Sequence, residues 1–457
     1  MIYLKSFCFS AIFSFISVDS IYFIIVVAVA SAIFGISGGI IFHKRKTNNR
    51  QMLEQNPLYV PSGKLEAFES SNEDGYKSFD PEVQLGKRQR LKAKFNYLHA
   101  RLNGKPDMIK PNTDIKDQVK VLPYNKSREL PRTSLQLGDE LGSGMFGKVF
   151  KGTLSGIDVG DDKLTVAIKT QSGYNDEDGI GDFLDEIKIM SNVYPHLNLV
   201  SMVGACTSGL RDEGLLWLVL EFCPHGDLKK FLERNEKHIL DGKELIDPIN
   251  SRCLIKWAFD IANGMQYLAN NKIMHGDLAA RNVLLGDAPA SSGACLVAKV
   301  SDFGLSKKFY DNLKYKKSSR MLVPWRWMAI EYLTRDFFTL TSDVWSFGVL
   351  FYEILSFGES PYGQQGYEEV IDKLQKGYRL TCPKKIKGMK TSWVPKKVYE
   401  KVSQVCFKED PIERASFSDV IEILKKVLRQ EEIDHYDKMK NLYTSSSSLH
   451  NSTQSLC

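Results

Sequence analysis

A strong excess of charge of one sign is missing from this sequence. Its 61 Lys and Arg stand against 55 Asp and Glu, which leaves a net charge of +6 over 457 residues. So small an imbalance gives no reason to expect a nucleic acid as a partner. The eight Cys form no CxxC pair and no Cys/His spacing typical of a zinc site, so we expect reduced thiols. Internal repeats are missing too, which argues against a solenoid or a propeller.

Long apolar runs are confined to the N-terminus. Residues 21–42 carry no charged side chain, and their number is close to the ~20 that a helix needs to cross a bilayer. The basic cluster His43 to Lys46 follows at once, so the positive-inside rule places the downstream chain in the cytosol. We therefore predict a single-pass protein, in the plasma membrane, with a transmembrane helix over residues 21–42.

Residues 1–20 are also apolar, with Lys5 near the start and Ser20 at the end. This pattern predicts a signal peptide cleaved after Ser20. The alternatives are an uncleaved apolar N-terminus and a gene model that lacks an ectodomain exon. Within the predicted span, Gly35 and Gly39 form a GxxxG pair, which favours a homodimer formed through this helix. Small residues are also common in spans that do not pair.

Residues 43–121 are polar and mixed in charge, which predicts a largely flexible juxtamembrane linker. Within it, the sequence from Asn56 to Tyr59 reads Asn-Pro-x-Tyr. It resembles the ligand of phosphotyrosine-binding adaptor domains, and Asn-Pro favours a turn that would present Tyr59. The basic cluster Lys87 to Lys94 is open to two interpretations, a solvated basic helix or a segment lying on anionic lipid.

Between the termini, a part rich in strand signals precedes a part rich in helix signals. Alternating apolar residues around glycines and short apolar runs predict strands over residues 135–150, 166–169 and 215–222. Helical spacing is found over residues 183–190 and then dominates after Gly226, over 254–269, 340–355, 367–376, 398–407 and 417–429. Residues 432–457 contain a run of serines and are predicted to be a disordered tail.

One short stretch, His275 to Asn282, concentrates side chains suited to chemistry. It supplies Asp277, placed to accept a proton from a hydroxyl, and Asn282, whose amide oxygen can bind a metal ion. Asp302, followed by Phe303 and Gly304, is a second metal ligand. Mg²⁺ prefers such hard oxygen ligands. The order and spacing resemble the catalytic loop and the metal loop of a protein kinase.

The strand-rich part adds the expected nucleotide site. Gly142, Gly144 and Gly147 form a GxGxxG sequence that continues as a strand, which favours a kinase phosphate loop over a dinucleotide fold. The resemblance implies that Lys169 contacts phosphates and pairs with Glu186, and that ATP and Mg²⁺ are the cofactors. The implied ATP site comprises Leu141, Gly142, Ser143, Gly144, Gly147, Val149, Ala167, Lys169, Leu220, Glu221 and Cys223.

Among the kinases, this sequence most resembles the tyrosine-specific branch. Arg281 and the segment from Pro324 to Met328 resemble the elements with which that branch places its substrate, which implies proteins containing tyrosine as substrates. Structural roles are implied for three residues: Glu331 and Arg414 as a buried ion pair, and Asp343 as a brace for the catalytic loop.

Among tyrosine kinases, residues 122–431 resemble the receptor-type group of the platelet-derived and vascular endothelial growth factor receptors. In place of that group's long kinase insert there are only residues 233–252, and we expect almost no ectodomain.

We therefore predict an α+β, two-lobed protein kinase fold, with an N-lobe over about 135–223 and a C-lobe over about 224–431, preceded by one transmembrane helix. The implied function is transfer of the ATP γ-phosphate to protein tyrosines, the chain's own included. The candidate sites of phosphorylation are Tyr315, Tyr310, Tyr59, Tyr436 and Tyr443.

Gly276 departs from the resemblance, because the family has Arg before the catalytic Asp. In the family that Arg pairs with a phosphorylated residue of the activation loop. Without it, we expect phosphorylation of Tyr315 to matter less, or to act through the lysines beside it. Two alternatives stay open: a catalytically weak pseudokinase that acts as a scaffold, and a soluble kinase whose N-terminus is wrongly assigned.

Overall fold

The computed structural model describes residues 87–110, 113, 118–144, 147–156, 163–171, 177–210, 215–241, 251–287, 296–303, 324–335, 337–388 and 395–454. The chain divides into two compact units, Met1–Gln89 and Arg90–Cys457, and the second holds the sheets and helices described below. The predicted signal peptide and transmembrane helix, the Asn56 to Tyr59 sequence, Tyr310 and Tyr315 lie outside the described residues. Within those residues, no helix is long and apolar enough to cross a membrane.

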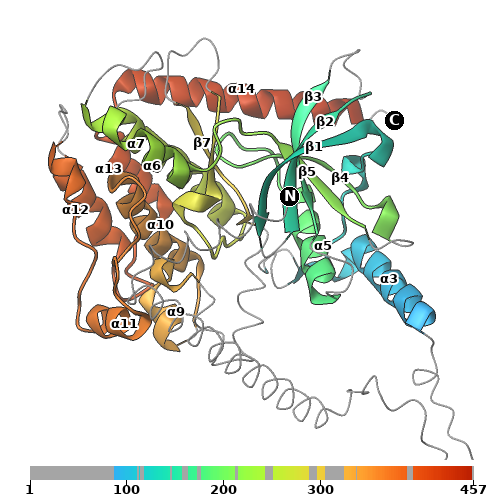
Figure 1. The fold of residues 1–457 in the computed structure, drawn as a ribbon, viewed down its shortest axis with the longest axis horizontal. Coiled ribbons are helices and arrows are strands. Elements are labelled where there is room, and N and C mark those ends of the chain that lie inside the picture. The colour runs from blue at the N-terminus through green and yellow to red at the C-terminus, as the bar shows by residue number, and fades with distance from the viewer. Residues whose placement is uncertain are drawn as a thin grey trace, which may run out of the picture. The chain divides into compact units, whose positions relative to one another are not determined.

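An antiparallel sheet of five strands forms the N-terminal lobe (Figure 1). Its strands are β1 (Leu135–Gly144), β2 (Gly147–Leu154), β3 (Leu164–Thr170), β4 (Met202–Cys206) and β5 (Trp217–Glu221), in the order β1-β2-β3-β5-β4. Strands β2 and β3 pair without interruption, from Lys148 opposite Thr170 to Leu154 opposite Leu164. Val166 and Ile168 of β3 are fully buried, as expected when alternate side chains of a strand face a core.

Helix α5 (Glu177–Ser191) packs beside β4 and carries a wide apolar face (Figure 1). Its residues Ile180, Phe183, Leu184 and Ile187 are almost completely buried. They recur at steps of three or four, the spacing that places side chains on one side of a helix. Because α5 is anchored by this face, the polar residues on its other positions are held in fixed directions.

The C-terminal lobe is helical around one small hairpin (Figure 1). Its helices are α6 (Leu228–Asp241), α7 (Ser251–Asn270), α9 (Ile330–Arg335), α10 (Leu340–Leu355), α11 (Tyr367–Gln375), α12 (Pro395–Cys406), α13 (Phe417–Lys425) and α14 (Gln430–Gln454). The hairpin pairs β6 (Val283–Gly286) with β7 (Val297–Val300). Trp257 of α7 and Phe347 and Phe351 of α10 are fully buried in the core. The predicted α+β arrangement of a strand-rich lobe before a helical lobe is confirmed.

Two segments predicted to be largely flexible or disordered contain helices, so those predictions are wrong in part, although a basic helix at Lys87 to Lys94 was one of the interpretations left open. Helix α3 (Lys87–Asn103) lies in the predicted flexible linker, and α14 occupies most of the predicted disordered tail. Both helices have an apolar side that finds a partner. Phe95, Leu98 and Leu102 of α3 and Tyr436 of α14 are buried in the main core. Burial of these side chains, each worth about 1.5–3 kcal/mol, offsets the polar composition on which the predictions rested.

The cysteines also differ from expectation at one position. Cys206, Cys223, Cys382 and Cys406 are free thiols, whereas the buried Cys253 is disulfide-bonded. The scattered positions of the cysteines along the chain gave no signal of this, because spacing alone does not reveal which residues meet in space.

Candidate active site

The glycine loop joins β1 to β2 at the edge of the sheet. Gly144 pairs with Gly147 across the turn. Gly147 has φ of +133°, and a Cβ atom built on it would lie 1.8 Å from the carbonyl oxygen of Thr170. No residue with a side chain fits there without moving β3. The glycine therefore lets the backbone of the loop lie close against the strand that carries Lys169.

Lys169 lies at the centre of a group of charges. Its Nζ donates to Glu186 Oε1 of α5 at 2.7 Å and to Asp302 Oδ1 at 2.8 Å. Lys169 and Glu186 are both buried. Burial alone would lower the pKa of Lys169, but the Asp302 and Glu186 carboxylates outweigh it and raise that pKa above its ordinary value. The predicted pairing of Lys169 with Glu186 is thus present, and Lys169 is a fixed cation.

Asp302 has an unusual backbone and a stabilised charge. Its φ is +57°, in the left-handed region that few residues other than glycine adopt. Burial pushes the pKa of its carboxyl upward, but Lys169 outweighs burial and holds that pKa below its ordinary value. Asp302 is therefore an ionised carboxylate, held in a conformation that costs about 1–3 kcal/mol elsewhere and is typical of functional sites.

Asp277 is held by two neighbours in its own loop. The guanidinium of Arg281 donates to its Oδ1, and Asn282 Nδ2 donates to its Oδ2 at 2.8 Å and to its backbone oxygen at 2.7 Å. These bonds fix the carboxylate while 18% of its side chain stays exposed. Because the Asn282 amide nitrogen is turned to Asp277, the amide oxygen is the atom it can offer to a metal ion.

His275 ties the catalytic loop to the strand before Asp302. The backbone N–H of Asp277 donates to its Nδ1 at 3.2 Å, and its Nε2 lies 3.0 Å from the backbone oxygen of Ser301. An N–H can only donate, so Nδ1 carries the lone pair and Nε2 carries the proton. The ring is completely buried, in keeping with a structural role that fixes Asp277 relative to Asp302.

Asp343 of α10 braces the same loop from the other side. Its Oδ2 accepts from the N–H of His275 at 2.8 Å, and its Oδ1 accepts from the N–H of Gly276 at 2.9 Å. Gly276 has φ of +75°, a conformation in which a glycine avoids the strain that a side chain would bring. The bracing role predicted for Asp343 agrees with these contacts, and Gly276 donates to it through its backbone alone.

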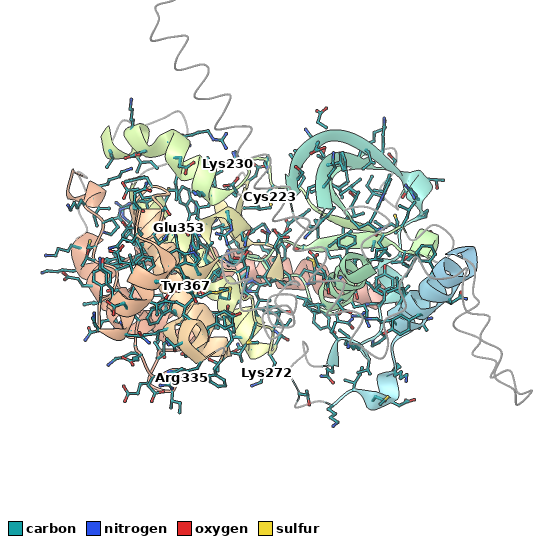
Figure 2. The ribbon with its side chains drawn as sticks, turned by 60° about the horizontal axis from the view of Figure 1, so that its bottom comes forward. Cys223, Lys230, Lys272, Arg335, Glu353 and Tyr367 are labelled. Atoms are coloured by element: carbon teal, nitrogen blue, oxygen red, sulfur yellow. The ribbon has the colours of Figure 1, made fainter. Side chains whose placement is uncertain are left out.

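A buried carboxylate that the sequence did not single out links the catalytic loop to the Pro324–Met328 segment. Glu353 of α10 accepts from the N–H of Ala280 at 2.9 Å and from Trp327 Nε1 at 2.7 Å. Burial raises its pKa to about 7. The ring of Trp327 lies under the Arg281 guanidinium, 4.5 Å from its Cζ, a cation–π contact. Figure 2 labels Glu353 among the helices of the C-terminal lobe.

The predicted ion pair is present. The Nη1 and Nη2 atoms of Arg414 donate to the two carboxylate oxygens of Glu331, each at 2.8 Å. Both residues are buried, and Ser342 Oγ donates to the same carboxylate at 2.7 Å. The bidentate geometry fixes the start of α9, and with it the end of the segment that carries Trp327.

The predicted ATP-binding residues come from four strands and the segment that leaves the sheet. Ala167 pairs with Leu220 across β3 and β5, and Val149 pairs with Lys169 across β2 and β3. Cys223 is buried just after β5, and Figure 2 shows it between the two lobes. The Glu221 carboxylate instead accepts from the N–H of Ser201 at 2.6 Å and from Lys299 at 3.1 Å. The Glu221 carboxylate is therefore turned toward Ser201 and Lys299.

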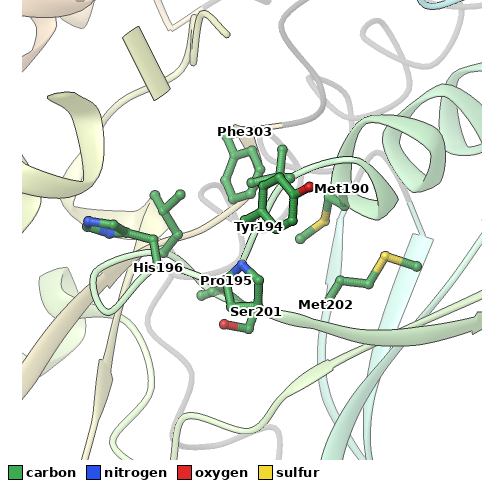
Figure 3. Close-up of a pocket in the computed structure, with 10 residues that line it drawn as sticks. Met190, Tyr194, Pro195, His196, Ser201, Met202 and Phe303 are labelled. Carbon is green, nitrogen blue, oxygen red and sulfur yellow. The ribbon is translucent and has the colours of Figure 1, made fainter. Parts of the chain in front are cut away.

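A pocket lies beside this site, under α5 (Figure 3). Its lining includes Met190 of α5, Met202 of β4 and Phe303, which directly follows Asp302. It contains none of the predicted catalytic residues. Phe303 is buried, so the metal loop is fixed to the same apolar cluster that supports α5.

Two candidate phosphorylation sites lie on α14. Tyr436 is buried, and its hydroxyl donates to Asn198 Oδ1 at 2.9 Å. The Tyr443 hydroxyl is 2.6 Å from Ser201 Oγ, and Lys299 Nζ lies 5.2 Å from the centre of its ring. Both tyrosines bind the segment that leads into β4, so a phosphate could reach Tyr436 only after α14 leaves its place.

The comparisons with known proteins agree with this geometry. Residues 135–424 match the family model described as protein tyrosine and serine/threonine kinase. The chain is 35% identical to the angiopoietin-1 receptor of Danio rerio over 303 residues, 65% of this chain and 25% of that relative. It is 31% identical to a fibroblast growth factor receptor of Hydra vulgaris over 350 residues, 76% of this chain and 40% of the relative. Vascular endothelial growth factor receptor 3 of Mus musculus is 30% identical over 370 residues, 69% of this chain and 26% of the relative. The matches thus span well under half the length of these relatives.

Proposed function

Because the chain belongs to the protein tyrosine and serine/threonine kinase family, we propose that it transfers the γ-phosphate of ATP to tyrosines of proteins, its own included. The observation that carries the proposal is the joint placement of Lys169, Asp277 and Asp302. Lys169 bonds to Asp302, and His275 links the backbone of Asp277 to Ser301, the residue before Asp302. These contacts support roles for Lys169 as the cation, Asp277 as the proton acceptor and Asp302 as the metal ligand. The relatives named as receptors for growth factors and angiopoietin support the receptor-type branch.

The donor set fits Mg²⁺ and a nucleotide. Asp302 offers a carboxylate and Asn282 an amide oxygen, and phosphate oxygens and water normally supply the remaining ligands of Mg²⁺. In the described part of the chain, no group of three or more His, Cys, Asp or Glu could hold a metal ion by itself. A bound Mg²⁺ would neutralise charge that develops on the transferred phosphoryl group.

The residues of this chain would then have separate roles in the transfer. Lys169 binds phosphate oxygens, and the backbone of the Gly147 loop covers them. Asp277 orients the substrate hydroxyl and accepts its proton at the carboxylate. Arg281, held over Trp327, keeps that carboxylate in place and gives the substrate-binding segment a fixed edge. The link from Arg281 to Trp327 supports tyrosine as the acceptor, because both belong to the segments that resemble the tyrosine-specific branch.

The finer assignments rest on the sequence. The uncharged residues 21–42 support a single span, in the plasma membrane, with the kinase lobes in the cytosol. The Gly35 and Gly39 pair supports a homodimer, and the Asn56 to Tyr59 sequence supports an adaptor with a phosphotyrosine-binding domain. The motifs between Leu122 and Asp227 support the platelet-derived and vascular endothelial growth factor receptor group.

The test is phosphate transfer by the full chain, recovered from membranes in detergent, with Mg-ATP and a Glu/Tyr polymer. We expect transfer that Asp277→Asn lowers by at least about a hundredfold, since general base catalysis contributes roughly 10²–10⁴. Asp372→Asn is the matched control, because the exposed Asp372 pairs with the exposed Lys376 of its own helix. Nucleotide binding, followed as a shift of Tm by Mg-ADP, should survive Asp277→Asn. Binding without transfer by the unaltered chain would favour a scaffold, and a chain found free of membranes would contradict the single span.

A further inference from the structure

Helix α5 presents two different faces to the molecule. One face carries Glu186, whose side chain is 1% exposed and bonds to Lys169. The adjacent positions Asp185 and Lys188 are buried as well, and they bond in another direction. Successive residues of a helix point about 100° apart, so a partner that holds Asp185 and Lys188 also sets the rotation and position of Glu186.

That partner is α3, the helix that precedes the kinase lobes. The Arg101 guanidinium donates to the Asp185 carboxylate, and the two side chains are only 15% and 5% exposed. Lys188, completely buried, donates from Nζ to the backbone oxygen of Arg101 at 2.8 Å and to that of Lys120 at 3.3 Å. Two charged residues of α5 therefore bond to α3 and to Lys120, which follows α3 in the chain.

Apolar contacts and close packing complete this interface. Phe95, Leu98 and Leu102 of α3 belong to the same buried cluster as Ile180 and Leu184 of α5. Gly181 of α5 makes room for Arg101, because a Cβ atom there would lie 3.0 Å from Arg101 Nη1. Figure 1 shows the two helices side by side. The interface is thus specific in charge and in shape.

The end of α3 is fixed to the body of the lobe. Gly104 ends the helix with φ of +62°, and a Cβ atom there would lie 2.5 Å from the backbone oxygen of Val121. The N–H of Lys105 donates to that oxygen at 2.7 Å, and the N–H of Tyr124 donates to the oxygen of Leu102 at 2.9 Å. Because its end is held in this way, α3 forms a rigid support for α5.

We propose that α3 is an activating brace for the kinase site, in which Arg101 is a positioning residue that holds α5 so that Glu186 meets Lys169. This inference rests on the proposed function and concerns how that activity is regulated. Loss of α3 would leave the carboxylate of Asp185 and the ammonium of Lys188 buried without these ligands, which is strongly unfavourable. With α3 removed, α5 moves so that these groups reach water, and the Glu186–Lys169 contact opens. The segment between the predicted membrane span and the kinase lobes therefore favours the active arrangement.

The experiment compares Arg101→Gln and Arg101→Lys with the unaltered full chain, purified in detergent. Arg101→Gln should lower kcat/KM by about tenfold, as expected for residues coupled through one network. It should also reduce the Tm shift produced by Mg-ADP and speed hydrogen exchange in residues 177–191, with exchange in α10 unchanged. Arg101→Lys keeps the charge and should recover most of the rate. Arg335→Gln is the control, an exposed arginine at the end of α9.

The other possible outcomes separate a failure of the brace from a failure of the proposed function. If Arg101→Gln keeps full activity and leaves exchange in α5 unchanged, the brace is refuted. Higher activity in that variant would also refute it, because α3 would then restrain the site. If the unaltered chain transfers no phosphate, the proposed function fails, while exchange in α5 and the Mg-ADP shift still test the brace. Should Arg101→Gln not fold, Leu98→Ala, which loosens α3 through its apolar side, must give the same local change in α5.

Discussion

At the scale of single residues, Gly276 changes backbone energetics as well as charge. Its φ of +75° lies in the left-handed region, where a residue with a side chain pays roughly 1–2 kcal/mol. The N–H that bonds to Asp343 depends on this conformation. The glycine therefore relieves strain beside Asp277 at the same position where the charge of the family's arginine is missing.

We predict that Gly276→Arg lowers the free energy of unfolding by about 1 kcal/mol and makes phosphate transfer depend on phosphorylation of Tyr315. The introduced guanidinium would need an anionic partner, which a phosphotyrosine supplies. The measurement is denaturant unfolding together with transfer rates before and after phosphatase treatment. Gly276→Ala introduces the backbone strain without the positive charge, so it should lower the free energy of unfolding without making transfer depend on phosphorylation. Loss of transfer in Tyr315→Phe of the otherwise unaltered chain would contradict the account.

Glu353 predicts a pH dependence of stability. Burial raises its pKa from 4.5 to about 7, so between these values the unfolded chain has lost a proton that the folded chain keeps. Stability from this group is therefore lost as the pH rises through that window and is constant above it. Glu353→Gln has no such proton, and because Oε2 accepts both bonds, the amide oxygen can take its place.

We expect the stability of Glu353→Gln, relative to the unaltered chain, to increase by about 3 kcal/mol between pH 4.5 and pH 7.5. Denaturant titrations at several pH values measure this difference. The exposed Glu368→Gln is the control and should follow the unaltered chain at every pH. If the stability of Glu353→Gln instead changes with pH in parallel with that of the unaltered chain, the Glu353 carboxyl has its ordinary pKa in the folded protein.

At the scale of elements, α14 fixes the two lobes to one another through two tyrosines. Tyr436 bonds to Asn198, stacks edge-on against Phe259 of α7 and joins the main core. Tyr443 bonds to Ser201 just before β4. The helix thus contacts the C-terminal lobe and the entry to the sheet at once, so its loss would loosen the connection between the lobes.

For this helix we predict that Tyr436→Phe lowers the free energy of unfolding by about 1–2 kcal/mol, because Asn198 Oδ1 loses a buried donor. Tyr443→Phe, at a half-exposed site, should cost less. During autophosphorylation followed by mass spectrometry, phosphate should appear on Tyr443 before Tyr436. Equal rates at the two tyrosines would contradict the buried position of Tyr436.

At the scale of the whole molecule, the sequence points more directly to the residues of the candidate site than to the edges of the fold. The residues of the site carry chemistry in a fixed order, so Lys169, Glu186, Asp277 and Asp302 could be named in advance. For α3, a basic helix was one of two interpretations of its first half, but its buried side was not foreseen although Phe95, Leu98 and Leu102 recur at helical steps, because its polar composition was given more weight. Glu353 could not be found, since its role arises only when α10 meets the catalytic loop.

The central claim is that this chain transfers phosphate to tyrosine. The most direct measurement is phosphoamino-acid analysis of protein labelled by the full chain with radioactive Mg-ATP, on a substrate mixture that offers serine, threonine and tyrosine equally. The account predicts label on phosphotyrosine, and at least about a hundredfold less of it with Asp277→Asn. Label on phosphoserine or phosphothreonine, or bound nucleotide with no label at all, would contradict it.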